Sequence, residues 1–211
     1  TGIDFYNYTN SAATSGNFIR YNLIQDIGET TYNWGIGVLI YNNFYADITH
    51  NVLTRVRTGI QTGNFFAANP GTTGNISDNQ IGVWRLGIFH NLAYANASPL
   101  TLANNTITAE NYSGATRWNG ILLTSIQGTV TAAIEANAIV IPGTVSYPAP
   151  GYTAGYNVWN VTTSAPITIR GGTVTGGNYG VWVNNFTGYN SNAGNTGVKI
   201  DNVNISNASL A

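Results

Sequence analysis

Apolar residues and asparagine recur along this chain in one fixed pattern. In the segment from Ile48 to Leu53, the apolar Ile48 is followed three positions later by Asn51, and two positions after that by Leu53. The last two copies of the pattern are degenerate, because Gly172 and Val203 stand in place of the asparagine. A pattern that returns every 26 to 35 residues indicates a solenoid, in which each repeat forms one coil. The seven copies open at Ile19, Ile48, Ile76, Leu102, Ile134, Ile169 and Ile200.

A glycine followed by an apolar or aromatic residue alternates with the asparagine motif. In three repeats this glycine lies 11 residues after the opening residue of the motif, and in the other three it lies 16, 18 or 21 residues after it. The longer repeats therefore carry insertions at the same turn, within residues 25–34, 108–119 and 140–154. We expect such insertions to lie on one face of a solenoid. The glycines are Gly35, Gly59, Gly87, Gly120, Gly155 and Gly180.

The segments between the turns predict β-strands. Val, Ile, Thr and aromatic residues dominate them, and no segment has a sustained helical period with caps. Strands of successive coils lie about 4.8 Å apart, so residues at one repeat position form a row. One buried row of hydrogen-bonded amides is expected from Asn22, Asn51, Asn79, Asn105 and Asn137. The sequence therefore predicts an all-β fold with one domain over 1–211, a single-stranded right-handed parallel β-helix of about seven coils starting near 19, 48, 76, 102, 134, 169 and 200.

The alternation of asparagine motif and glycine resembles the repeats of right-handed parallel β-helix proteins in the pectin-lyase-like superfamily. The resemblance extends from Gly2 to Ile205 and implies the fold. It does not select a function, because this superfamily includes polysaccharide lyases, hydrolases, epimerases, phage tailspikes, adhesins and autotransporter passengers. The polygalacturonase-like signatures Asn-Thr-Asp, Asp-Asp, Gly-His-Gly and Arg-Ile-Lys are all missing from the sequence.

The composition of the chain limits the classes of binding partner that we expect. Only 7% of the residues are charged, the net charge is −1, and the seven lysines and arginines are scattered along the chain. Nucleic acid and anionic membranes are therefore not expected as partners. The chain contains no run of about 18 apolar residues, which is the length needed to span a bilayer. Since the chain has no cysteine, disulfides and thiolate metal sites are excluded, and we expect neither a metal nor a cofactor.

Low charge, many Asn and Thr residues and the absence of cysteine suggest an extracellular or cell-surface protein. Asn-x-Ser/Thr sequons, which accept glycans in secreted proteins, occur nine times. The candidate glycosylation sites are Asn7, Asn75, Asn96, Asn104, Asn111, Asn160, Asn185, Asn204 and Asn207.

The candidate catalytic residues in the sequence are His50, Asp78 and Arg55. His50 and Asp78 stand one position before the motif asparagine in adjacent repeats, so they are expected to be neighbours. A His–carboxylate pair can perform acid–base chemistry, and Arg55 follows closely. The alternative interpretation, which we favour, is a pair of residues that only caps a turn. The paired carboxylates of a glycosidase could also meet across coils.

Aromatic residues predict a binding face. Tyr112, Trp118, Tyr147 and Tyr152 belong to the second and third insertions. Phe89 and Trp182 are expected in one outward row, with Trp159 two positions along in its own coil. Exposed aromatic rows stack on sugars or form protein interfaces, whereas aromatic residues on folded-back loops would be buried.

We therefore expect an extracellular structural or adhesive β-solenoid without catalytic activity. The chain begins near a glycine of the repeat and ends just after an asparagine-motif copy, so the ends of two chains would be nearly in register. This predicts a head-to-tail homo-oligomer or filament; a segment of a larger surface protein is the equal alternative. A carbohydrate-active enzyme, either a polysaccharide lyase or a hydrolase, and a carbohydrate-binding module are the further alternatives, so polysaccharide is a possible partner.

Overall fold

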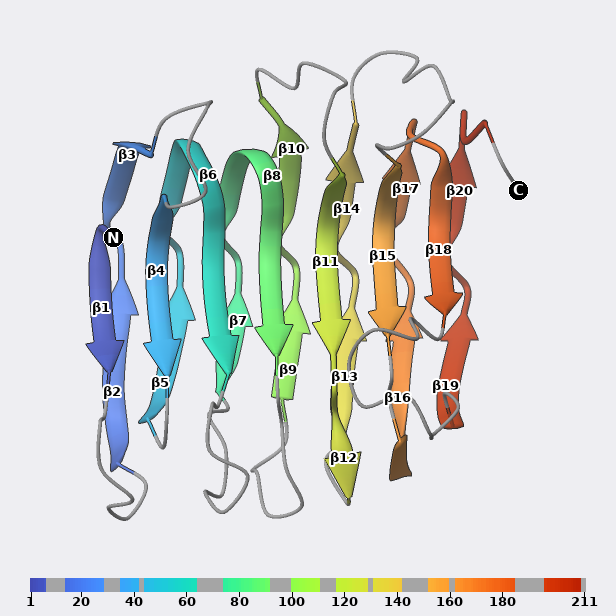
Figure 1. The fold of residues 1–211 in the computed structure, drawn as a ribbon, viewed down its shortest axis with the longest axis horizontal. Coiled ribbons are helices and arrows are strands. Elements are labelled where there is room, and N and C mark those ends of the chain that lie inside the picture. Colours follow the sequence, from blue (N-terminus) through green and yellow to red (C-terminus); the bar gives the residue numbers. More distant parts are fainter. Residues whose placement is uncertain are drawn as a thin grey trace.

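Parallel β-strands stacked into two sheets form the fold (Figure 1). The computed structural model describes residues 1–6, 14–28, 35–41, 44–63, 74–91, 100–110, 117–128, 131–141, 152–159, 162–184 and 196–209, and none of these residues is helical. Within these ranges every paired strand runs parallel to its neighbour. The all-β prediction is confirmed: the chain is a parallel β-solenoid.

The first sheet has 12 strands among the described residues. They are β1 (Ile3–Tyr6), β3 (Leu23–Ile27), β4 (Ile36–Tyr41), β6 (Val52–Gly63), β8 (Gln80–Asn91), β10 (Thr106–Ala109), β11 (Trp118–Thr124), β14 (Ala138–Val140), β15 (Thr153–Trp159), β17 (Thr173–Thr175), β18 (Tyr179–Asn184) and β20 (Asn204–Ser206). The long strands β6 and β8 bend, so that they pair with β3 and β10 at one end and with β4 and β11 at the other.

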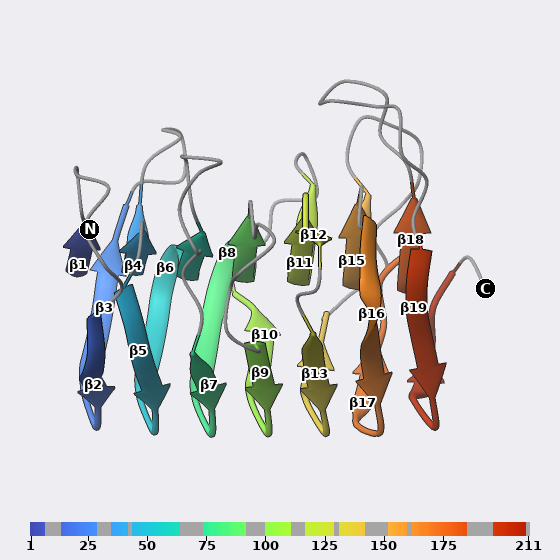
Figure 2. The same cartoon turned by 90° about the horizontal axis from the view of Figure 1, so that it is seen from below.

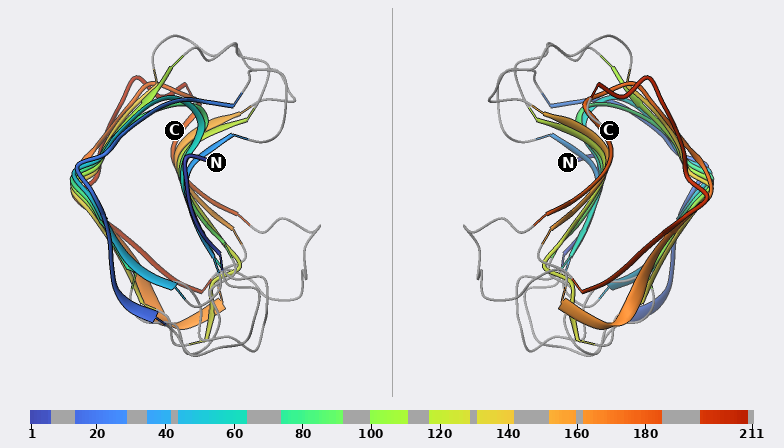
Figure 3. Two further views of the ribbon diagram at one scale, coloured as in Figure 1. Left: turned by 90° about the vertical axis from the view of Figure 1, so that its left-hand side faces the viewer. Right: turned by 90° about the vertical axis from the view of Figure 1, so that its right-hand side faces the viewer.

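The second sheet has eight strands in the described part of the chain. They are β2 (Thr14–Arg20), β5 (Phe44–Thr49), β7 (Asn75–Ser77), β9 (Leu100–Ala103), β12 (Gln127–Gly128), β13 (Ala132–Glu135), β16 (Thr162–Arg170) and β19 (Thr196–Asp201). Figure 2 shows β2, β5, β7, β9, β13, β16 and β19 following one another in sequence order along the long axis. Viewed along that axis, the strands of successive coils superpose around one central core (Figure 3).

The opening residues of the asparagine motif pair in register across the second sheet. Ile48, for example, lies between Ile19 and Ile76. These side chains are buried in the core in every coil except the last, where Ile200 is 51% exposed; Ile48 is only 1% exposed. Burial of each such side chain contributes about 1.5–3 kcal/mol. The complete row is Ile19, Ile48, Ile76, Leu102, Ile134, Ile169 and Ile200.

A left-handed backbone turn joins each motif strand of the second sheet to the first sheet. His50 has φ 57° and Asp78 has φ 58°, and Gly171, with φ 60°, occupies the same place in a later coil. This conformation disfavours most side chains but turns the chain sharply within one residue. The other described residues of this turn row are Tyr21, Asn104, Ala136 and Asn202.

Glycines form a second row, on the first sheet. A Cβ atom added to Gly59 would lie 2.6 Å from the carbonyl oxygen of Gly87, which shows how closely the coils approach here. In the first coil the sequence interpretation was wrong. Gly37 occupies this row, since Ile36 pairs with Thr58 and Val38 with Ile60, whereas Gly35 lies two residues earlier.

Candidate functional site

The motif asparagines lie in one hydrogen-bonded row inside the turn. Asn51 Nδ2 donates to Asn79 Oδ1 over 3.0 Å, and Asn79 Nδ2 donates to Asn105 Oδ1 over 2.9 Å. The same oxygens accept backbone N–H groups, and each amide also donates to a carbonyl of the preceding coil. The row runs through Asn22, Asn51, Asn79, Asn105 and Asn137. The side-chain amides of this row hydrogen-bond to one another, so the row is structural.

The candidate catalytic residues do not assemble into one site. His50 and Asp78 lie at neighbouring places in the exposed turn row, but no hydrogen bond or ion pair joins their side chains in the part of the chain described. The His50 ring lies against Tyr21 instead, with centroids 5.1 Å apart. Arg55 pairs with Asp26 over 2.6 Å, and its backbone N–H donates to Glu110 Oε2.

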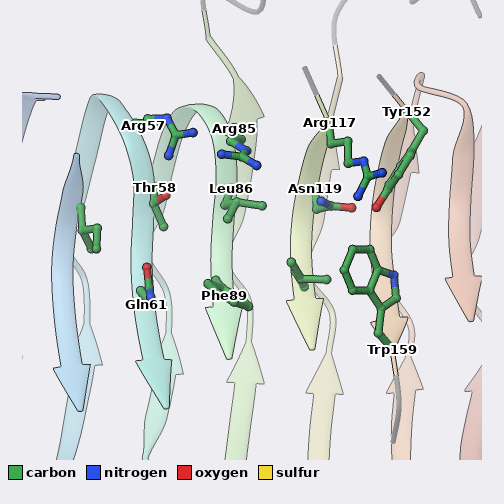
Figure 4. A pocket seen from close by; sticks show the side chains of 12 residues that line it. Arg57, Thr58, Gln61, Arg85, Leu86, Phe89, Arg117, Asn119, Tyr152 and Trp159 are labelled. Carbon is green, nitrogen blue, oxygen red and sulfur yellow. The ribbon is translucent and has the colours of Figure 1, made fainter. Parts of the chain in front are cut away.

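A groove crosses five strands of the first sheet, three of which, β4, β11 and β15, follow the insertions. It encloses about 320 Å³ and extends over β4, β6, β8, β11 and β15 (Figure 4). Two rows of paired residues form its base, Thr58–Leu86–Asn119 and Gln61–Phe89–Leu122. Each row runs along the solenoid axis, with one residue from each coil. The groove therefore presents similar positions at the strand spacing of about 4.8 Å.

Three arginines lie along one edge of this groove. Arg57 comes from β6, Arg85 from β8, and Arg117 directly precedes β11 (Figure 4). All three are partly buried. The Arg117 guanidinium lies over the Tyr152 ring, with its Cζ 5.0 Å from the ring centroid. Arg85 Nε is buried and has no hydrogen-bond partner within the described structure.

The electrostatics of the groove reflect burial and crowding of positive charge. Burial and, secondarily, the neighbouring Arg85 lower the pKa of Arg57 from its usual value. Burial also raises the pKa of Tyr152, against the opposing effect of Arg117. Both shifts have the same main cause, which is partial desolvation of the groove; nearby positive charge adds to the shift of Arg57 and opposes that of Tyr152.

The predicted binding-face aromatics separate into different environments. Phe89, Tyr152 and Trp159 line the groove. Trp182 lies beside it on β18, stacked on Tyr179 with centroids 4.8 Å apart and edge-on to Tyr152 at 4.2 Å.

The expectation of an exposed Trp118 was wrong. It is 0% exposed, and its Nε1 donates to the Val83 carbonyl over 3.3 Å, because β11 begins with a residue that turns into the core. Tyr112 and Tyr147 lie outside the described residues.

The sequons also differ in accessibility. Asn104, Asn204 and Asn207 are exposed, whereas Asn75 is half-buried in β7. The remaining candidates, Asn7, Asn96, Asn111, Asn160 and Asn185, lie outside the described residues.

Sequence reasoning missed the arginine edge. Arg57 and Arg85 each stand two residues before a glycine of the repeat, and Arg117 stands three residues before one. Aligning the repeats on the glycines would have placed these arginines near one another. The extra residue at Arg117 reflects the start of β11, where Trp118 occupies the intervening position.

Comparisons with known proteins add no relative. Neither the protein-family models nor the curated proteins nor the solved structures give a match. The structure alone therefore defines the class of protein: a parallel β-solenoid with a groove lined by arginine and aromatic side chains. Over the described ranges, no helix has the length and apolar character that a bilayer crossing needs, and no group of three or more His, Asp or Glu side chains could hold a metal ion.

Proposed function

We propose that this chain is an extracellular, non-catalytic β-solenoid that adheres to polysaccharide through the groove on its first sheet. The observation that carries the proposal is the meeting of aromatic and arginine side chains from consecutive coils in one groove. Aromatic side chains offer apolar faces on which sugar rings pack, and guanidinium groups donate hydrogen bonds in a fixed planar geometry. The regular strand spacing suits a ligand that is itself a repeating polymer.

The lining of the groove favours binding over acid–base chemistry. General acid–base catalysis needs a titratable side chain such as His, Asp, Glu or Lys near the reacting bond. Among the described residues that line the groove there is no His, Asp, Glu or Lys; tyrosine can also act as an acid or base, but burial raises the pKa of the lining residue Tyr152 further from neutrality. His50 and Asp78 belong to the turn row that leads from the second sheet to the first, and neither lines the groove.

Binding to a panel of immobilised polysaccharides tests this function. The wild-type protein is expected to be retained by at least one polysaccharide, and Trp159→Ala and Phe89→Ala should each weaken retention about tenfold or more. Tyr21→Ala is the matched control, because Tyr21 is an exposed aromatic residue outside the groove. The proposal fails if no polysaccharide retains the wild type, or if Tyr21→Ala weakens retention as much as Trp159→Ala.

Association of copies along the solenoid axis is a second function that we propose. It is favoured by apolar side chains on the outermost described strands. Ile200 on β19 is 51% exposed and Ile205 on β20 is 44% exposed, while Phe18 and Leu23 are exposed on β2 and β3. Unpaired strand edges add a further strand readily. Light scattering over a range of concentrations should give a rising mass that Ile200→Lys abolishes, whereas a constant monomer mass would exclude such association.

A further inference from the structure

The arginine edge concentrates the positive charge of the chain. Of its seven lysines and arginines, three line this one groove. No aspartate or glutamate is among the described lining residues, so the formal charge there is +3 although the whole chain carries −1. In the described structure Arg20 pairs with Asp47 and Arg170 pairs with Asp201, and neither of these arginines lines the groove.

One hydrogen-bond donor in this group of arginines, Arg85 Nε, lacks an acceptor in the described structure. Arg85 Nε is buried and has no hydrogen-bond partner in the described structure, and Arg85 is in none of its ion pairs. A buried polar group without a partner is unfavourable, and so are guanidinium groups brought close together in a partly desolvated region. A negatively charged oxygen placed between them would relieve both. The groove is therefore organised for an acidic ligand rather than a neutral one.

The repeat of the solenoid also constrains the shape of that ligand. The three arginines come from consecutive coils, and the coils are separated by about 4.8 Å. This spacing is comparable with the length of one pyranose unit in a linear polysaccharide. A chain lying along the solenoid axis would thus bring its successive units past successive arginines. The row that contains Phe89 runs parallel to the arginine edge (Figure 4), so the sugar rings of such a chain would lie against this row.

We propose that the groove selects a linear acidic polysaccharide, whose carboxylate or sulfate groups on successive sugar units bind Arg57, Arg85 and Arg117. The sugar rings pack against Phe89 and Trp159, and the polymer runs across the strands. This inference rests on the proposed function, since it names the ligand of the same groove. Single-stranded nucleic acid is also anionic, but it is usually bound by an extended positive groove, whereas the rest of this chain has four positive and eight negative residues, a net charge of −4.

Four polymers distinguish the possibilities in a calorimetric titration: polygalacturonate, dextran sulfate, neutral dextran and poly(dT). The inference predicts binding to one or both acidic polysaccharides at least tenfold tighter than to dextran and to poly(dT). Polygalacturonate and dextran sulfate separate a carboxylate from a sulfate ester as the recognised group. Binding should weaken as salt is added, because the charged contacts are partly exposed to solvent.

Arg85→Gln provides the specific test, with Arg170→Gln as its control. Both variants remove one positive charge, but Arg170 lies on the second sheet. Arg85→Gln should weaken acidic polysaccharide binding about tenfold, and Arg170→Gln should change it less than twofold, with both variants melting as the wild type does.

Four results would overturn the inference. Equal binding of dextran and polygalacturonate would refute acidic selectivity while leaving polysaccharide adhesion intact. Tighter binding of poly(dT) than of any polysaccharide would replace the ligand class. Loss of binding in Arg170→Gln equal to that in Arg85→Gln would show attraction to the whole chain rather than to the groove. Binding to no polysaccharide at all would overturn the proposed function as well.

Discussion

The Asn51 side-chain amide donates a hydrogen bond to Oδ1 of Asn79, and the backbone N–H of Asn51 donates to the same oxygen over 2.9 Å. One buried oxygen thus satisfies two donors of the preceding coil. Asn79 in turn donates to Asn105 and to the Ile48 carbonyl. Every interior member of this row therefore supports both of its neighbours.

Replacing Asn79 should show this dependence. Asn79→Ala removes the acceptor of two buried donors and the donor of a buried carbonyl, so the free energy of unfolding should fall by about 3 kcal/mol. Asn22→Ala is the control, because Asn22 is half-buried at the start of the row and accepts from no other row asparagine in the described structure. Denaturant unfolding measures both. Equal losses for the two variants would show that the row does not act as a connected unit.

The glycine row sets a second limit on substitution. In Gly59→Ala the new Cβ would meet the Gly87 carbonyl oxygen at 2.6 Å and the Ile81 side chain, so the coils would have to separate. A loss of about 3 kcal/mol in unfolding free energy is expected from such overpacking. Gly171→Ala should cost only about 1 kcal/mol, because the site is open and Ala136 already has positive φ in the same turn row. A tolerated Gly59→Ala would contradict the close approach of the coils.

His90 should make stability depend on pH. It is 0% exposed, its Nδ1 lies 2.7 Å from Thr62 Oγ1, and burial lowers its pKa from 6.5 to about 4. As pH falls below 6.5, the unfolded chain takes up a proton that folded His90 does not. The stabilisation is therefore complete above about pH 6.5 and is lost as pH falls toward 4, by about 3 kcal/mol in all.

A variant separates the pH dependence due to His90 from that of the carboxylates, which titrate over a similar range of pH. His90→Gln keeps a polar side chain beside Thr62 but does not titrate, so its stability should fall less between pH 7 and pH 4 than that of the wild type. Parallel curves for the wild type and His90→Gln would mean that His90 takes up its proton over the same pH range in the folded and the unfolded state, which contradicts the lowered pKa.

The strand stacking was predictable because it follows from spacing. Ile48 and Asn51 recur at matched positions, and a parallel stack converts equal positions into rows. The groove was less predictable, since insertions shift its residues along the chain. Arg117 lies one place earlier than Arg85 relative to its glycine, and Trp118 turns inward where an exposed ring was expected. The direction of such a side chain depends on local packing at the start of β11, which the repeat pattern does not encode.

A crystal structure of the protein soaked with an acidic oligosaccharide long enough to span three coils would test the central claim most directly. The account predicts sugar density along the groove, with acid oxygens within hydrogen-bond distance of Arg57, Arg85 and Arg117 and sugar rings against Phe89 and Trp159. Density on the second sheet or at the turn row containing His50, with the groove empty at saturating ligand, would contradict it.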